Sequence, residues 1–145
     1  MIQVQIAKSE QDMEKVYSVR RKVFIEEQQV PESIEIDEKE EQSIHFLATA
    51  DGKPVGAGRL RIEGTKSKAE RVCVLPDFRR SGVGALLMEE MEQFSKKQAL
   101  KEIVLNAQTH AIPFYKRIGY EVTSELFYDA GIEHRSMSKS LDGIG

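Results

Sequence analysis

The sequence is most informative at VCVLPDFRRSGVG, residues 72–84. Its first residues are apolar and β-branched, as in a buried strand, and a proline ends that pattern. Gly82 and Gly84 then open an apolar stripe at helical spacing. Glycines at the start of a helix leave backbone N–H groups uncovered, and such groups bind phosphate. With the positive charge of Arg79 and Arg80 beside them, these residues predict a site for a phosphorylated ligand.

The composition is typical of a globular protein with one core. We expect a single domain over residues 1–145, with 40% hydrophobic and 31% charged residues. The formal net charge of −3 gives no support for nucleic-acid binding, and no apolar run is long enough to cross a bilayer. One cysteine, Cys73, and the lack of a signal-peptide pattern predict a cytoplasmic protein without an internal disulfide.

Hydrophobic periodicity predicts an α/β fold, a mixed sheet with helices packed on it. The expected strands are 2–6, 44–50, 55–62, 69–75, 103–105, 121–128 and 133–141. Helices are expected from the N-cap Ser9 to before Val30, from Gly82 to about Lys97, and from Ile112 to Gly119, with a short extra helix in the acidic segment 26–41. The element order is therefore β-α-(α)-β-β-β-α-β-α-β-β.

Turn residues refine this order. Asp51-Gly52 predicts a tight hairpin, because both central positions of a type I′ turn need a positive φ. Gly56 and Gly58 within one strand predict either a bulge or a close backbone approach. The sequence Asp129-Ala130-Gly131 joins the last two expected strands.

Taken alone, the two glycines of Gly82-x-Gly84 are a weak motif. A third glycine and the Gly-Lys-Ser/Thr of a P-loop are both missing, so glycines that serve helix packing are the alternative. The wider pattern, Arg79-x-x-Gly82-x-Gly84 between a strand and a helix, with Phe114-Tyr115 and Gly119-Tyr120 later, resembles the GNAT superfamily of acyl-CoA-dependent N-acetyltransferases. Arg20-x-x-Val23-Phe24 and Gly131-Ile132-x-His134 are similar to its small bacterial ElaA-like members.

The resemblance covers nearly the whole chain and implies a GNAT fold with splayed central strands. It also implies acetyl-CoA as cofactor, with the pyrophosphate on main-chain N–H groups of residues 80–84 and the pantetheine along the strand that ends at Val74. The residues expected to bind the cofactor are Val72, Cys73, Val74, Arg79, Arg80, Ser81, Gly82, Val83, Gly84 and Asn106. For Asn106, a hydrogen bond to its own backbone is an equal alternative.

Catalytic candidates follow from the same resemblance. Tyr115 is the expected general acid for the leaving thiolate, against the alternative of a packed aromatic residue. Glu27, Glu70 and Asp37 are the candidate general bases, directly or through water. The acidic segment 26–41 either attracts a cationic amine or is simply a solvated loop, which we expect. The three histidines have no metal-ligand spacing, and Cys73 is expected to be an inert buried thiol.

The sequence therefore predicts an N-acetyltransferase that moves an acetyl group from acetyl-CoA to a primary amine of a small molecule or peptide. The amine would attack directly in a ternary complex. A non-catalytic acyl-CoA sensor or interaction module on the same fold is the main alternative, and a nucleotide-phosphate binder is a third. Neither nucleic acid nor membrane is expected as a partner. The acceptor and the oligomeric state stay open, with a homodimer among the alternatives.

Overall fold

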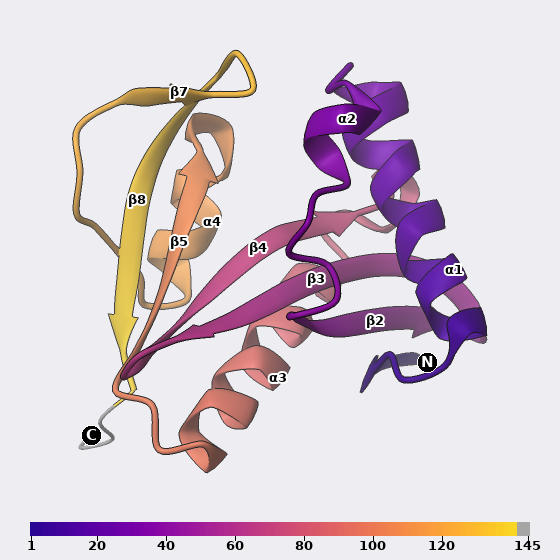
Figure 1. Cartoon of the computed structure of the whole chain (residues 1–145), viewed down its shortest axis with the longest axis horizontal. Coiled ribbons are helices and arrows are strands. Elements are labelled where there is room, and N and C mark those ends of the chain that lie inside the picture. Colours follow the sequence, from indigo (N-terminus) through magenta and orange to yellow (C-terminus); the bar gives the residue numbers. More distant parts are fainter. Residues whose placement is uncertain (142–145) are drawn as a thin grey trace.

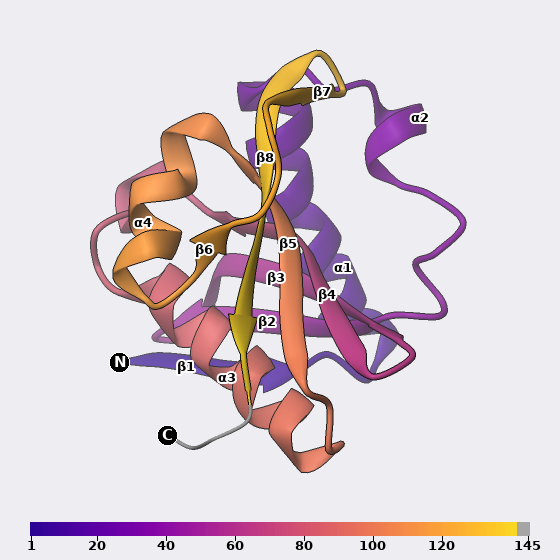
Figure 2. The same ribbon diagram turned by 90° about the vertical axis from the view of Figure 1, so that its left-hand side faces the viewer.

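The computed structural model describes residues 1–141 as one sheet with helices on both faces (Figures 1 and 2). The strands are β1 Ile2–Ile6, β2 Ile44–Ala50, β3 Lys53–Glu63, β4 Lys66–Val74, β5 Glu102–Gln108, β6 Glu121–Val122, β7 Phe127–Asp129 and β8 Ile132–Ser140. The helices are α1 Glu10–Arg20, α2 Glu32–Glu35, α3 Val83–Lys97 and α4 Ile112–Arg117, with a π-helix at Arg21–Glu27 and 3₁₀ turns at Pro76–Phe78 and Thr109–Ala111. The sheet order is β1-β2-β3-β4-β5-β8-β6, with β7 also on β8. This confirms the predicted mixed sheet.

α1 begins at the cap that the sequence predicts. The Oγ atom of Ser9 accepts a hydrogen bond of 3.0 Å from the backbone N–H of Asp12. The helix continues directly into the π-helix, which ends at Glu27 with Gln28 as its C-cap, before the proline as expected. This continuous helical segment carries Gln28 to the end of β5, where its side chain forms a hydrogen bond of 2.8 Å with Gln108.

β2 shows why both faces of the sheet are covered. Leu47 packs in one cluster with Val16 of α1, whereas its neighbour Phe46 packs in another with Leu87 and Met91 of α3. Because adjacent residues of a strand point to opposite faces, α1 and α3 lie on opposite sides of the sheet (Figure 2). Among residues 1–141, no helix is long and apolar enough to span a bilayer.

The two glycines of β3 serve the close approach of α3. A Cβ atom at Gly56 would stand 2.8 Å from Cγ1 of Val83, and one at Gly58 would stand 2.7 Å from Cε of Met91. The predicted hairpin at Asp51-Gly52 is also present, with φ angles of +52° and +84°.

The predicted strand 121–128 is wrong as a single strand, since the structure divides it into β6 and β7. The ladder to β8 is interrupted by a side chain, because the Oγ of Ser124 accepts the backbone N–H of Ser136 at 2.8 Å. β4, by contrast, is longer than predicted. It begins at Lys66 rather than Ala69, because the turn at Gly64 (φ +64°) is tight.

The central strands β4 and β5 part along their length, as expected for a GNAT fold (Figure 1). They pair in parallel only over Lys66–Ala69 and Glu102–Leu105. Beyond this point β4 continues with β3, and β5 continues with β8. Arg71 has a φ of +54° where the β3–β4 register shifts, which is a bulge that increases local twist. The strands therefore separate at this bulge, before Pro76 is reached.

Candidate active site

The parting of β4 and β5 leaves two strand edges without partners on their inner sides. On β4 the edge includes Val72, Cys73 and Val74, and on β5 it begins at Asn106. Cys73 points toward α1, and burial raises the pKa of its thiol to about 12. A thiol that stays protonated is a poor nucleophile, so this position offers a ligand its main chain rather than its sulfur.

The start of α3 follows the end of β4 along the chain, after the 3₁₀ turn Pro76–Phe78. Gly82 is the N-cap residue with a φ of +90°, and no side chain caps the helix. A Cβ atom at Gly82 would meet nothing within 4 Å, whereas one at Gly84 would stand 3.2 Å from Cζ of Phe114. Gly82 therefore keeps open the space next to the uncovered N–H groups, and Gly84 lets α4 approach.

The two arginines of this loop differ in their surroundings. Arg79 binds both carboxylate oxygens of Glu27 at 2.8 and 2.6 Å, and its Nε donates to the carbonyl of Val74 at 2.9 Å. These bonds tie the π-helix to the end of β4. The hydrogen bond from Arg79 also lowers the pKa of Glu27. Arg80, by contrast, forms no side-chain bond with any residue among 1–141 and keeps its charge available to a ligand.

Tyr115 lies on α4 with its ring edge-on to Phe114 and Tyr120, at centroid distances of 5.0 and 5.7 Å. The residue is buried, and its hydroxyl keeps some solvent access and has no hydrogen-bond partner within the described part of the chain. Burial, and to a lesser extent the charge of a Cys73 thiolate, raise the pKa of Tyr115 above its ordinary value. Tyr115 belongs to the hydrophobic cluster that includes Leu105 and Ala107 of β5, and Val72 and Val74 of β4 pack against this cluster. The structure thus brings a protonated phenol to the parted strands.

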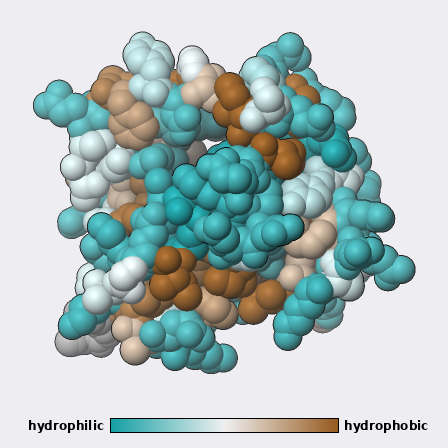
Figure 3. Space-filling model, in the orientation of Figure 1, coloured by the Kyte–Doolittle hydropathy of each residue, from teal (hydrophilic) through white to brown (hydrophobic). Residues whose placement is uncertain are grey.

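A cavity of about 290 Å³ opens where the strands part. Its walls come from the π-helix, the segment after α2, β4, β5 and the β7–β8 turn, and Figure 3 shows the surface hollowed between these elements. Asn106 and Gln108 of β5 line it. The Oδ1 of Asn106 accepts a bond of 2.8 Å from Ser136, whereas its amide nitrogen has no partner among residues 1–141.

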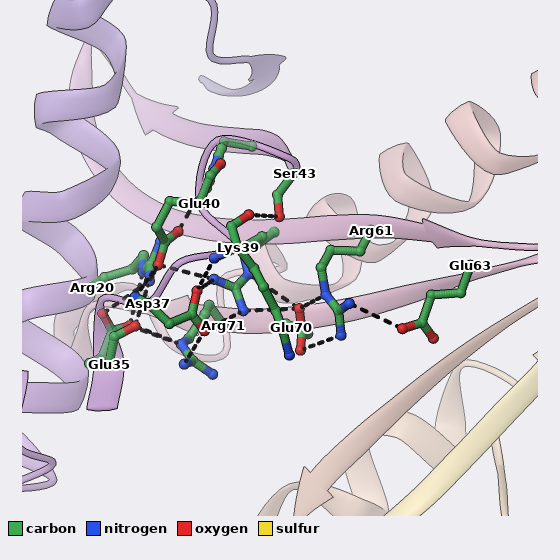
Figure 4. Close-up of polar contacts among 12 residues, drawn as sticks. Arg20, Glu35, Asp37, Lys39, Glu40, Ser43, Arg61, Glu63, Glu70 and Arg71 are labelled. Carbon is green, nitrogen blue, oxygen red and sulfur yellow. Dashed lines mark hydrogen bonds and ion pairs between the residues drawn. The ribbon is translucent and has the colours of Figure 1, made fainter. Parts of the chain in front are cut away.

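The acidic segment is held against the sheet by arginines (Figure 4). Arg20 contacts both carboxylate oxygens of Glu35 at 2.9 and 3.0 Å and both of Glu40 at 2.8 and 2.7 Å. All three side chains are buried. The expected solvated loop is therefore wrong for Glu35 and Glu40. The sequence did contain a sign that Arg20 is buried: it follows Val16 by four residues and so lies on the buried face of α1.

Glu70 belongs to the same network. Its Oε1 accepts bonds from Nε of Arg61 at 2.6 Å and from Nη2 of Arg59 at 3.0 Å, and Arg59 also holds Asp37 at 2.8 and 3.1 Å. Burial alone would raise the pKa of Glu70, but the two arginines lower it below its ordinary value. Likewise, Arg59 outweighs burial and lowers the pKa of Asp37 to about 2. Carboxylates held in this way accept protons poorly.

His134 was not singled out as catalytic from the sequence. It stands opposite Gln108 in the β5–β8 ladder, stacks on Phe127 at 5.9 Å and lines the cavity. Its Nδ1 lies 2.7 Å from the carbonyl oxygen of Ile132, which assigns the proton to Nδ1 and the lone pair to Nε2. Nε2 has no partner among residues 1–141 and keeps some solvent access, on a residue that lines the cavity. The only sequence signal was the motif Gly131-Ile132-x-His134.

Comparison with known proteins agrees with this geometry. The acetyltransferase (GNAT) domain family matches residues 5–141. The chain is 46% identical over 135 residues, 92% of its length, to the uncharacterized N-acetyltransferase YjcF of Bacillus subtilis, of which 96% is covered. The chain therefore belongs to the GNAT acetyltransferase family, and the chemistry of that family is acyl transfer.

Solved structures confirm the predicted fold. Escherichia coli ElaA superposes with a TM-score of 0.84 at 23% identity, covering 96% of this chain and 99% of ElaA. The PaiA N-acetyltransferase of Thermoplasma acidophilum, solved in complex with coenzyme A, gives a TM-score of 0.75 at 21% identity, covering 97% and 99%. The expected GNAT fold and its likeness to ElaA are both confirmed.

Proposed function

We propose that this acyltransferase moves an acetyl group from acetyl-CoA to a primary amine, by direct attack in a ternary complex. The observation that carries the proposal is the parting of β4 and β5: β4 leads along the chain to the uncovered start of α3, and both strands contribute to the cavity that Asn106 and His134 also line. The coenzyme A complex of the similar PaiA structure supports the choice of donor. The acceptor is an amine of a small molecule or peptide that enters from the cavity.

The chain can hold the donor with groups already identified. Main-chain N–H groups of residues 80–84 would bind the pyrophosphate, and Arg80 would add charge. The pantetheine would lie along Val72, Cys73 and Val74, with the free amide of Asn106 on the opposite edge. Arg79 contributes indirectly, because its bonds to Glu27 and Val74 fix the end of β4.

Tyr115 is the proposed general acid. As the amine nitrogen bonds to the thioester carbon, the C–S bond breaks and the sulfur leaves as a thiolate that needs a proton. A phenol with a raised pKa and an unengaged hydroxyl is protonated at neutral pH and free to donate. A packed aromatic residue is the alternative, and replacement of Tyr115 by Phe decides between the two roles.

The proposed general base is His134, in place of Glu27 and Glu70. An attacking ammonium group must first lose a proton. Glu27 is held by Arg79, and Glu70 is held by Arg59 and Arg61, which lowers the basicity of both. The Nε2 of His134 has a lone pair without a partner among residues 1–141, and the ring is fixed by stacking and by the Nδ1 bond. It can therefore take the proton that the amine loses.

The first test is Tyr115→Phe, with Tyr128→Phe as the exposed control. Release of free thiol from acetyl-CoA is followed over a panel of small amines, polyamines and peptide N-termini. We expect Tyr115→Phe to bind coenzyme A normally but to lower kcat by about 10²- to 10⁴-fold, the range of general acid catalysis. Unchanged kinetics would remove Tyr115 from the mechanism. Coenzyme A binding without turnover of any amine by the wild type would instead support the sensor alternative.

The second test is His134→Asn, with His110→Asn as control. Asparagine can still donate to the carbonyl of Ile132 but lacks the lone pair of Nε2. We expect kcat/KM near neutral pH to fall by about 10²-fold or more in His134→Asn only. Activity should recover as the pH is raised, because more of the amine is then already neutral. A loss that is the same at every pH would show that His134 only positions other groups.

A further inference from the structure

Three cationic side chains line the cavity beside the proposed site: Lys39 after α2, and Lys68 and Arg71 of β4. The side chains of Lys39 and Lys68 have no ion-pair or hydrogen-bond partner among residues 1–141. In Figure 4, Lys39 extends toward the arginine–carboxylate network without a bond from its ammonium group. Two ammonium groups are thus available to whatever enters the cavity.

Arg71 is placed at the cavity by the bulge of β4. Its φ of +54° is a strained conformation for a residue with a Cβ atom. Its Nε lies 3.2 Å from the carbonyl of Glu35, and its Nη2 lies 3.3 Å from that of Ile34 and 3.4 Å from Asp37. Its Nη1 has no partner within residues 1–141. One face of the guanidinium is therefore anchored, and one nitrogen is free to donate.

The carboxylates of the same wall do not neutralise these cations. Glu35, Asp37 and Glu70 line the cavity, but each is bound by an arginine of the network. The network pairs four arginines with four carboxylates near the cavity: Arg20, Arg59, Arg61, Arg71, Glu35, Asp37, Glu40 and Glu70. Arg61 also pairs with the more exposed Glu63, which does not line the cavity. Lys39 and Lys68 are left over, against the single exposed carboxylate of Asp129 at the rim.

We propose that the acceptor amine carries an anionic group, a carboxylate or a phosphate, which binds between Lys39, Lys68 and Arg71. This inference rests on the proposed function and names its substrate class. Opposite charge and free donors favour an oxyanion at this wall, while the amine faces His134 on the opposite strand. The volume of about 290 Å³ suits a small molecule with one such group. The acidic segment therefore serves to fix arginines rather than to attract a bare cationic amine.

The test measures binding to the protein saturated with coenzyme A, so that the pyrophosphate site is filled. The probes are O-phosphoethanolamine, β-alanine and ethanolamine, which share a two-carbon spacing and differ in a phosphate, a carboxylate or a neutral hydroxyl. We expect at least one anionic probe to bind at least about tenfold more tightly than ethanolamine, since hydrogen bonds to a charged group are stronger than those to a neutral hydroxyl. Comparing the two anionic probes tells which oxyanion is preferred.

Variants locate the binding. Lys39→Gln and Lys68→Gln should each weaken the anionic probe by about tenfold, and Lys66→Gln, on the same strand but away from the cavity, should not. Equal binding of ethanolamine, or lysine variants without effect, would overturn the inference. Measuring thiol release distinguishes a failure of this inference from a failure of the proposed function. If the anionic probes bind but no thiol forms, transfer fails and the binding site stands; if ethanolamine is acetylated as efficiently, transfer stands and the inference fails.

Discussion

Arg20 and Arg21 are sequence neighbours that bind the same kind of partner in different surroundings. Arg20 and Glu35 are each 1% exposed, whereas Arg21 and Glu32 are 52% and 62% exposed. A buried carboxylate that loses its arginine keeps the full penalty of lost hydration, while an exposed one is rehydrated. The free energy of unfolding should therefore respond very differently to loss of the two arginines.

We expect Arg20→Met to lower the free energy of unfolding by about 3–5 kcal/mol, because Glu35 and Glu40 are left buried without a partner. Arg21→Met should change it by less than about 1 kcal/mol. Urea unfolding of both variants at neutral pH measures the difference. Similar losses in the two variants would mean that Arg20 is not held as tightly as its distances indicate.

At the scale of elements, α3 combines a start that is open to a ligand with a side that packs on β3. Gly82 and Gly64 both have a positive φ and empty space where a Cβ would be, but only Gly82 lies at the helix start. Alanine should cost each position about 1–2 kcal/mol of stability, since both have a positive φ, +90° at Gly82 and +64° at Gly64. Comparing the two alanine variants thus distinguishes the effect of backbone strain from the effect on ligand binding.

The expected result is that Gly82→Ala weakens coenzyme A binding by roughly tenfold, about the value of one lost hydrogen bond to a charged group. Gly64→Ala should bind coenzyme A like the wild type. Calorimetric titration with coenzyme A gives both dissociation constants, and urea unfolding checks that the stability losses match. Equal affinities in the two variants would place the pyrophosphate elsewhere.

Elements with a local pattern could be predicted from the sequence, and those that depend on distant partners could not. The start of α1, the helix α3 and the hairpin at Asp51-Gly52 follow from caps, periodicity and turn residues. The division of strand 121–128 depends on a bond from Ser136 to Ser124, twelve residues away. The parting of β4 and β5 was expected only through the family resemblance, because periodicity does not say where two strands stop pairing.

The residues of the candidate site likewise divide into those that a local motif predicts and those that depend on distant partners. The glycine loop and Tyr115 lie in short motifs, so the sequence places them, and their proposed roles now have supporting geometry. Glu70 was a reasonable base on its strand, but its arginine partners lie across the sheet on β3 and depend on the β3–β4 register. His134 is revealed by its ring contacts and by the cavity that it lines.

At the scale of the whole molecule, the arginine–carboxylate network joins α1, the segment 35–40, β3 and β4 into one unit along one wall of the cavity. The helices α3 and α4 and their glycine contacts lie on the opposite face of the sheet (Figure 2). The proposed donor and acceptor sites thus lie on different faces that meet where β4 and β5 part. The network is built on charge, so its contribution to stability must depend on pH.

Acid should therefore weaken the fold well before all carboxylates are protonated. The pKa of Asp37 is lowered to about 2, and those of Glu40 and Glu70 are also lowered. A carboxyl group with a lowered pKa in the folded state binds its proton more readily in the unfolded chain. The network consequently stabilises the fold at neutral pH, and this contribution is lost as the pH falls from about 4 toward 2.

The measurement is urea unfolding between pH 7 and pH 2 for the wild type, Asp37→Asn and Glu38→Gln. Glu38 is the adjacent exposed acid and has no partner among residues 1–141, so its variant should follow the wild-type pH dependence. Asp37→Asn should be less stable at pH 7, because Arg59 loses a charged partner, and its stability should fall less steeply with acid. Parallel curves for all three proteins would mean that Asp37 has an ordinary pKa and that the network does not hold the cavity wall in place through charge.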